Sequence, residues 1–188
     1  MRIIAGKFRG RKLKSPPSPQ TRPTSDRLRE TLFNILAPRI EDARFLDLCA
    51  GTGAVGIEAL SRGAAQVTFV DQSREMCVLI KANLEPLKVH QDEIEIVTAE
   101  ASAFLRRRIK KQAESFDIIF FDPPYAADYE VVLDYISEHA EQLLSEGGVM
   151  VVEHDKKREL REEAGQLKRY RVVKQGDSAL SFYQRTAA

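Results

Sequence analysis

The sequence predicts an α/β protein built on a doubly wound, seven-stranded sheet, in which five parallel strands are followed by an antiparallel hairpin. Between residues 44 and 154, short apolar stretches rich in β-branched and aromatic residues alternate with stretches of helical periodicity. This alternation is typical of βαβ units, whose helices cover both faces of a parallel sheet. It stops near the end of the chain, where two strand-like stretches meet at Gly176-Asp177 and predict a hairpin.

The expected elements follow one another in order. A helix is expected to begin at the candidate cap residues Thr24 and Ser25 and to end at Pro38, because leucine and isoleucine recur between them at helical spacing. The five parallel strands are expected at residues 44–49, 66–71, 93–99, 116–122 and 147–154. The intervening helices are expected at residues 57–64, after the second strand through about Leu87, over roughly 101–113 and over roughly 129–145. This arrangement is Rossmann-like and binds ligands beyond the carboxyl ends of the strands.

The amino-terminal part differs in charge from the rest of the chain. We expect one main domain, residues 21–188, preceded by a basic arm and proline-rich connector, residues 1–20. The first 30 residues carry a charge of +7 and the remaining 158 residues a charge of −6. This asymmetry predicts that a polyanion docks at the arm, with a solvated tail as the alternative. Apolar residues and two glycines in RIIAGKFRGRKL predict that the arm forms a small β-hairpin.

The composition argues against several classes of protein. No apolar run approaches the ~20 residues of a membrane-spanning helix, and the first residues lack the apolar core of a secretory signal. The two cysteines, Cys49 and Cys77, have no CxxC spacing, and the three histidines are scattered, so we expect neither a disulfide framework nor a metal site. We therefore expect a cytoplasmic protein without membrane contact, and a monomer, since no feature demands an oligomer.

A glycine-rich loop follows the first expected strand. Residues 51–56, GTGAVG, satisfy the G-x-G-x-x-G pattern between a strand and a helix, and Asp71 ends the second strand twenty residues past Gly51. Glycines let a ligand approach the backbone, and a carboxylate at this distance can bind a ribose. The loop thus predicts a nucleotide-type cofactor, which leaves an NAD-dependent oxidoreductase or a non-catalytic nucleotide-binding module open. Asp47, just before the loop, favours a cationic sulfonium over a pyrophosphate and hence S-adenosylmethionine.

The fourth expected strand ends in Asp122-Pro123-Pro124-Tyr125. An exocyclic amine of a nucleobase is a poor nucleophile, and acceptors placed on its hydrogens assist it. Asp122 offers a carboxylate and Pro123 a carbonyl, while the prolines supply no competing N–H donors. Tyr125 can stack on the base, an interaction worth about 1–3 kcal/mol. The segment predicts methylation of an exocyclic amine, and the alternative is a rigid turn with a stacked tyrosine.

Several of these motifs together resemble one enzyme family. The stretches IIAGKFRGRKL, TRPTSDRLRETLFNIL and DLCAGTGAVGIEALSRGA, with VD at 70–71 and DPPY at 122–125, are similar to motifs of the bacterial RsmD family. The resemblance covers nearly the whole chain. It implies methyl transfer from S-adenosylmethionine to the exocyclic N2 of one guanine in small-subunit (16S) ribosomal RNA, with ribosomal RNA or a 30S assembly particle as partner. The same motifs also serve other exocyclic amines, such as adenine N6 in RNA or DNA.

The resemblance implies roles for individual positions. The catalytic residues would be Asp122, Pro123, Pro124 and Tyr125. The cofactor-binding residues would be Arg22, Pro23, Thr24, Asp47, Gly51, Thr52, Gly53, Asp71, Gln72, Glu100 and Ala101. The RNA-binding residues would be Arg2, Lys7, Arg9, Arg11, Lys12 and Lys14. Glu100 would contact the adenine by its side chain or its backbone. The basic cluster at 106–111 is either a solvated helix face or a second RNA patch. Cys49 is expected to pack beside the loop rather than act as a nucleophile.

Overall fold

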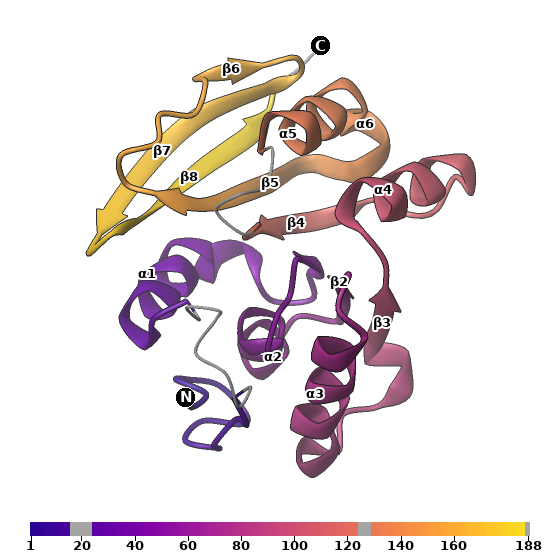
Figure 1. Cartoon of the computed structure of the whole chain (residues 1–188), viewed down its shortest axis with the longest axis vertical. Coiled ribbons are helices and arrows are strands. Elements are labelled where there is room, and N and C mark those ends of the chain that lie inside the picture. Colours follow the sequence, from indigo (N-terminus) through magenta and orange to yellow (C-terminus); the bar gives the residue numbers. More distant parts are fainter. Residues whose placement is uncertain (16–23, 124–128, 187–188) are drawn as a thin grey trace.

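The fold is centred on one eight-stranded sheet, seen in a computed structural model that describes residues 1–15, 24–123 and 129–186. The strand order is β3-β2-β1-β4-β5-β8-β7-β6 (Figure 1). The parallel strands are β1 (Arg44–Leu48), β2 (Gln66–Asp71), β3 (Ile94–Thr98), β4 (Phe116–Phe121) and β5 (Leu144–Asp155). The antiparallel strands are β6 (Glu163–Ala164), β7 (Leu167–Gln175) and β8 (Ser178–Arg185). The predicted doubly wound α/β sheet is confirmed, and the two-residue β6 extends it from seven strands to eight.

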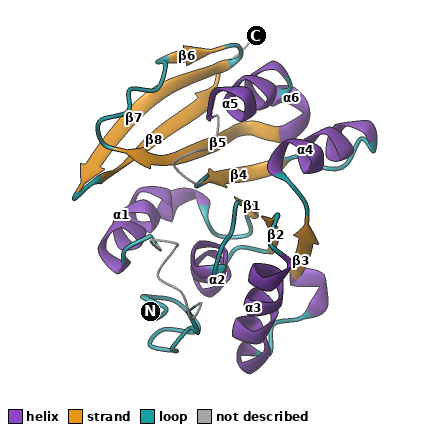
Figure 2. Ribbon diagram, viewed as in Figure 1, coloured by secondary structure: helices purple, strands orange, loops and turns teal. Residues whose placement is uncertain are grey.

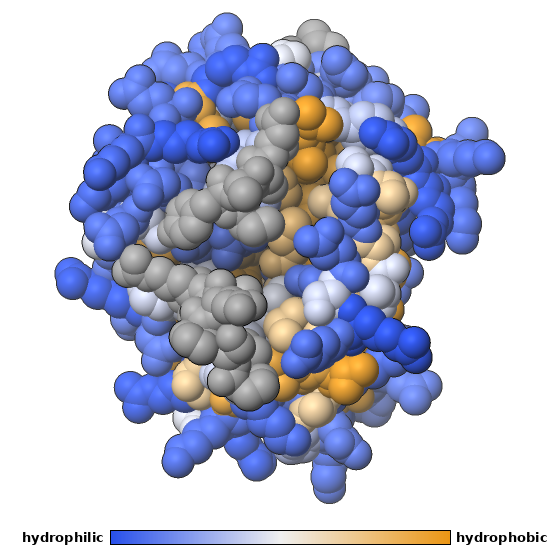
Figure 3. All heavy atoms as spheres, viewed as in Figure 1, coloured by the Kyte–Doolittle hydropathy of each residue, from blue (hydrophilic) through white to orange (hydrophobic). Residues whose placement is uncertain are grey.

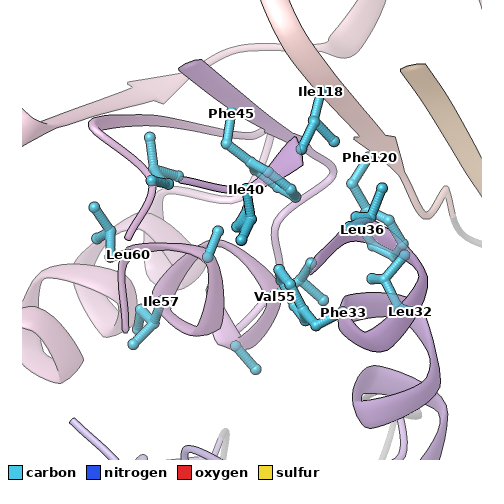
Figure 4. Packing of buried hydrophobic residues seen from close by; sticks show 14 of the residues in the cluster. Leu32, Phe33, Leu36, Ile40, Phe45, Val55, Ile57, Leu60, Ile118 and Phe120 are labelled. Carbon is cyan, nitrogen blue, oxygen red and sulfur yellow. The ribbon is translucent and has the colours of Figure 1, made fainter. Parts of the chain in front are cut away.

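Helices cover both faces of the sheet (Figure 2). On one face lie α1 (Asp26–Leu36), α2 (Ala54–Ser61) and α3 (Arg74–Leu84), and on the other α4 (Ala101–Lys110), α5 (Tyr129–Glu138) and α6 (Ala140–Leu143). Short 3-10 helices lie at Ala37–Arg39, Glu85–Leu87 and Gln91–Glu93. Alternate strand residues face the two cores, as Phe45 packs with α1 and α2 whereas Leu46 packs with α4 and α5. Figure 4 shows the first core, where Phe33 of α1 lies beside Val55 of α2 and Leu36 of α1 lies beside Phe120 of β4.

Several element boundaries differ from the sequence expectations. The helix expected at residues 57–64 is α2, which begins three residues earlier at Ala54 and ends at Ser61, so the last three residues of GTGAVG are already helical. The helix expected over 129–145 ends at Glu138, and the short α6 follows from Ala140 to Leu143. Strand β5 then begins at Leu144, three residues before the expected start, because Leu144 already pairs with Phe116 of β4. At the other end, Ser25 caps α1 by accepting a hydrogen bond from the Leu28 backbone N–H at 3.2 Å. None of the described helices has the length and apolar character that a membrane crossing requires.

The amino-terminal residues 1–15, here called the basic segment, pack against α2 and α3. The expected hairpin is reduced to one antiparallel bridge between Arg2 and Lys12, beside which the Ile3 N–H donates to the Arg11 carbonyl at 2.9 Å and the Leu13 N–H to the Met1 carbonyl at 3.1 Å. Ile3 and Leu13 are buried in the first core. Gly6, at φ +80°, lies so close to α2 that an added Cβ would stand 1.6 Å from the Ser61 carbonyl oxygen. This short pairing and the tertiary contacts with α2 together hold the segment. Its predicted division from the main domain near residue 20 lies outside the described residues.

Candidate active site

Four carboxylates gather at the carboxyl ends of four neighbouring strands. These are Asp47 and Glu153, within the last three residues of β1 and β5, Asp71 at the end of β2, and Asp122 just after β4. Each stands two positions after a residue of the first core, which puts all four on the face covered by α1–α3. Those core residues are Phe45, Phe69, Phe120 and Val151. We call this set the carboxylate edge. It flanks β1, whose two neighbours β2 and β4 connect in opposite directions, and this is where doubly wound sheets bind ligands.

The glycine-rich loop is held by two of these carboxylates. Asp47 accepts a hydrogen bond from the Gly56 backbone N–H at 2.8 Å, and Asp71 accepts one from the Gly51 backbone N–H at 2.8 Å. The second oxygen of Asp71 accepts the Ser73 N–H, also at 2.8 Å. Gly51 has φ +52°, and an added Cβ there would meet no atom within 4 Å. The loop backbone is thus fixed by the acids around it and open on the side where a ligand can approach.

The other two glycines of the loop serve the packing of α2. Gly53, at φ +75°, is the residue before α2, and a Cβ there would lie 3.0 Å from Ile80. Gly56 sits against β2, where an added Cβ would lie 2.3 Å from the Phe69 ring. Thr52, which lies between Gly51 and Gly53, is buried. The close contact of helix and strand keeps the amino end of α2 directed at the space above β1, as an approaching cofactor requires.

Three further predicted cofactor residues lie along the ends of β2 and β3. Gln72 follows Asp71 directly and is exposed. Glu100 is the N-cap residue of α4, but its exposed side chain makes no capping hydrogen bond. The Ala99 backbone N–H donates to the Asp71 carbonyl at 3.0 Å, which holds the two strand ends together. The structure therefore brings Gln72, Glu100 and Ala101 to the same sheet edge as the loop. Their contacts with a cofactor stay a prediction.

Asp122 stands directly beside this loop. Its backbone N–H donates to the Leu48 carbonyl at 3.3 Å, so the segment after β4 remains attached to the end of β1. The Pro123 carbonyl accepts a hydrogen bond from the buried Tyr129 hydroxyl at 3.3 Å. Arg158 in turn covers the Tyr129 ring, with its guanidinium carbon 4.2 Å from the ring centroid. Pro124 and Tyr125 lie outside the described residues, as do Arg22 and Pro23.

Glu153 is the site residue that sequence analysis did not assign. It is buried, and it accepts a hydrogen bond from the Thr24 hydroxyl at 2.9 Å. This contact brings Thr24, a predicted cofactor residue just before α1, to the end of β5 beside Asp122. The only sequence signal for Glu153 was an acid at the end of an apolar strand, and its relevance depends on the pairing of β5 with β4, which places the Glu153 and Asp122 positions side by side.

The carboxylate edge is electrostatically unfavourable by itself. Burial raises the pKa of Asp47 to about 7; the hydrogen bond from Gly56 opposes this rise and the charge of Asp71 adds to it. Burial, with the nearby charges of Glu153 and Asp47, also holds the pKa of Asp122 well above its usual range. A bound cation would relieve this repulsion by stabilising the ionised forms. The four carboxylates therefore fit a cofactor that carries positive charge close to the strand ends.

The environment of Cys49 argues against a thiolate nucleophile. This residue follows β1 with φ +68°, an uncommon conformation for a residue with a side chain. Burial and the charges of Asp71, Asp122 and Asp47 raise the pKa of its thiol to about 12. A thiol with that pKa stays protonated at neutral pH and is unreactive, in agreement with the packing role expected from the sequence.

The predicted RNA-binding cations of the basic segment are all exposed. Lys7 pairs with Glu93 at 3.2 Å, and Arg2 lies 3.9 Å from Asp26. Among the described residues, no ion pair involves the other four cations, namely Arg9, Arg11, Lys12 and Lys14. Figure 3 shows one face of the molecule, where a band of apolar side chains runs between strongly hydrophilic margins. The charged groups of the segment are thus accessible to a large anionic partner.

One cavity lies away from the carboxylate edge. This cavity, of about 330 Å³, lies at the amino ends of β1 and β4, the opposite end of the sheet, lined by residues that include Arg39, Asp117 and Ser145. Asp117 already accepts the Arg44 backbone N–H and the Ser145 hydroxyl. Across residues 1–15, 24–123 and 129–186, no cluster of three or more His, Cys, Asp or Glu side chains is arranged to hold a metal ion.

Comparison with known proteins assigns this arrangement to a family. The model of a family described as "Conserved hypothetical protein 95" matches residues 1–184. A Bacillus subtilis protein named "Putative rRNA methyltransferase YlbH" is 37% identical over 98% of this chain and 99% of its own length. The Escherichia coli "Ribosomal RNA small subunit methyltransferase D" is 46% identical over 66% of this chain and 60% of its own length.

A solved structure extends the similarity to the whole fold. The structure described as "Putative methyltransferase yhhF from Escherichia coli" has a TM-score of 0.86 and 35% identity, over 100% of this chain and 99% of that one. The cationic cofactor that the carboxylate edge fits is S-adenosylmethionine. The chain belongs to the RsmD family of S-adenosylmethionine-dependent ribosomal RNA methyltransferases.

Proposed function

We propose that this protein methylates the exocyclic N2 of a guanine in small-subunit ribosomal RNA. The observation that carries the proposal is the position of Asp122. Its backbone is hydrogen-bonded to Leu48, one residue past Asp47 and three before Gly51. The acceptor for an amine hydrogen and the loop for the methyl donor are therefore on adjacent strand ends, and proximity of this kind is the main resource of a group transfer. The name of the Escherichia coli relative supports the small subunit as the target.

On this proposal the residues divide into two groups around the reacting atoms. Asp71 faces the ribose side, and Asp47 contributes the negative charge near the cationic end of the cofactor. S-adenosylmethionine supplies an electrophilic methyl group on a sulfonium. The Asp122 carboxylate accepts one amine hydrogen and orients the N2 lone pair toward that methyl group. The Pro123 carbonyl, which Tyr129 already fixes through its hydroxyl, retains a second lone pair for the other hydrogen.

The transfer balances without an external reactant. The N2 lone pair forms the new N–C bond, the C–S bond breaks with its electrons on sulfur, and the positive charge passes to nitrogen. The nitrogen then releases a proton. Asp122 is suited to receive it, because burial and neighbouring acids hold its pKa well above the usual range of a carboxyl. The exposed cations of the basic segment bind the RNA phosphates.

Methyl transfer to ribosomal material tests the proposal. Small-subunit material from cells that lack the protein is incubated with radiolabelled S-adenosylmethionine, as naked RNA and as 30S particles side by side. We expect label in N2-methylguanosine at a single site. Label in N6-methyladenosine, or in DNA, would mean that the methyl acceptor is another exocyclic amine and not N2 of a guanine in ribosomal RNA. Cofactor binding without any labelled nucleic acid would overturn the proposal.

A further inference from the structure

The side chain of Asn83 connects two parts of the molecule that the proposed function uses separately. It lies in α3 and is buried. Its Oδ1 accepts the Lys14 backbone N–H at 2.8 Å, and its Nδ2 donates to the Lys14 carbonyl at 3.2 Å and to the Thr52 carbonyl at 3.1 Å. Both amide hydrogens and one oxygen lone pair are thus used on main-chain partners far away in the sequence.

One of these partners belongs to the basic segment. Lys14 lies near its end and has an exposed side chain. The beginning of the segment is fastened to α2, where Glu58 accepts the Ile4 N–H at 2.8 Å and the Ala5 N–H at 3.0 Å. Ser61 accepts the Phe8 N–H at 3.0 Å. The exposed cations are therefore presented by a backbone that α2 holds at one end and Asn83 holds at the other.

The other partner belongs to the cofactor loop. Thr52 lies between Gly51 and Gly53, and the Asn83 amide fixes the direction of its carbonyl. The peptide unit that carries this carbonyl leads into Gly53, whose positive φ and missing side chain lower the steric resistance to reorientation. The hydrogen bond from Asn83 restrains the carbonyl side of this peptide unit, while its N–H side, at Gly53, donates to the Ala50 carbonyl at 2.8 Å. The same Asn83 side chain restrains the backbone at Lys14.

We infer that Asn83 is a positioning residue that links cofactor binding to RNA binding. The inference rests on the proposed function. When a cofactor settles the Thr52 peptide unit, the Asn83 amide is fixed in the orientation that also clamps Lys14, so the basic segment meets RNA with less conformational freedom to lose. By thermodynamic linkage, RNA on the basic segment must tighten cofactor binding by the same factor. Couplings of this kind are commonly in the range of about 5–150-fold.

The test measures the coupling itself rather than either affinity. The dissociation constant of S-adenosylhomocysteine is measured for the full chain with and without a saturating small-subunit ribosomal RNA transcript. For the wild type we expect the RNA to tighten binding by about fivefold or more. Asn83→Asp keeps the oxygen that accepts the Lys14 N–H but replaces the donor of both carbonyl bonds, and Asn83→Ala removes all three bonds. For both variants we expect a ratio near one, with folding checked by thermal melting.

A matched control separates linkage from a general loosening. Ser61→Ala removes a contact to the basic segment and leaves the Thr52–Asn83–Lys14 connection intact, so we expect weaker RNA binding with an unchanged coupling ratio. An Asn83 variant that loses cofactor affinity by the same factor with and without RNA keeps the coupling ratio of the wild type, and this result would overturn the inference. A wild type whose coupling ratio is one would overturn it as well. A wild type that binds cofactor but no ribosomal RNA would instead overturn the proposed function.

Discussion

The carboxylate edge and the basic segment carry opposite charges in opposite environments. The four acids at the strand ends are buried or half-buried, and two of them have raised pKa values. The six cations of the basic segment are exposed. Buried charges interact strongly over short distances and select a small, shaped cation, whereas exposed charges are screened and suit a large polyanion. The comparison teaches that charge alone does not identify a partner, and that burial decides which size of ligand each region can take.

The largest effect is expected from removing the acceptor at the carboxylate edge. Asp122→Ala should lower the rate of methyl transfer by about 10²–10³-fold, the range found when one preorganised hydrogen-bonding group is removed from an active site. The dissociation constant of S-adenosylhomocysteine should change little, because Asp71 and the glycine loop remain. Single-turnover kinetics and equilibrium binding measure the two quantities. Equal losses in both would mean that Asp122 belongs to the cofactor site rather than to the amine site.

The basic segment offers an unusually well-matched pair of glycines. Gly6 and Gly10 have nearly the same φ, +80° and +81°, but only Gly6 lies against α2. Gly6→Ala should cost about 1–3 kcal/mol through overpacking against Ser61, and should weaken ribosomal RNA binding as the segment leaves α2. Gly10→Ala carries the same backbone strain without the clash, since its Cβ meets nothing within 4 Å. Similar losses of RNA affinity in both variants would show that docking on α2 is unimportant.

The raised pKa of Asp47 predicts a conflict between stability and cofactor binding. The folded-state pKa of about 7 lies above the ordinary value of 3.8, so the wild type loses stability as the pH rises through this interval. Asp47→Asn retains an oxygen for the Gly56 N–H but cannot ionise. It should be more stable than the wild type at pH 8 by about 1–4 kcal/mol, and this advantage should vanish near pH 4.

The affinity for the cofactor provides the control for this prediction. Asp47→Asn should bind S-adenosylmethionine more weakly than the wild type at pH 8, because the negative charge opposite the cation is gone. Chemical denaturation at both pH values and a binding titration give the two results. An Asp47→Asn protein that is less stable at pH 8 would contradict the electrostatic account of the edge.

The smallest effects are expected from single cations of the basic segment. Replacing Arg9, Arg11 or Lys12 by glutamine should weaken RNA binding modestly, and each lost phosphate contact should reduce the slope of log affinity against log salt by about 0.7–0.9. The comparison variant is Lys110→Gln in α4, an exposed lysine on the opposite face of the sheet. It belongs to the basic cluster at 106–111, for which a solvated helix face and a second RNA patch are the two alternatives. We expect no change of slope there. A change of slope for the Lys110 variant and none for the variants of the basic segment would indicate that RNA binds the opposite face of the sheet.

Much of the fold could be predicted because its signals are local. The strands β1, β2 and β4 are mostly apolar and buried, and glycine, aspartate or proline stands at or shortly after the end of each. The two-residue β6 is too short to show a periodicity. The hairpin expected at residues 1–15 is present only as a short antiparallel pairing, because the Ile4 and Ala5 N–H groups bond to Glu58 and the Phe8 N–H bonds to Ser61 instead of extending it.

The site was predictable where one short motif carries it. Asp47, Asp71 and Asp122 stand at strand ends that the sequence marks. Glu153 depends on a pairing register and on Thr24, a residue 129 positions away, so no local pattern could assign it. Asn83 is less visible still, since a lone asparagine in an amphipathic helix has no sequence signature, and only its three main-chain partners give it a role.

The central claim is that Asp122 faces the methyl group of the cofactor bound at the glycine loop. A crystal structure with S-adenosylhomocysteine tests it most directly. We expect the ribose on Asp71 and the sulfur directed toward Asp122, with room between them for a methyl group and an amine nitrogen that approach within about 3–3.5 Å. A cofactor whose sulfur points away from Asp122, or lies on the other face of the sheet, would contradict the account.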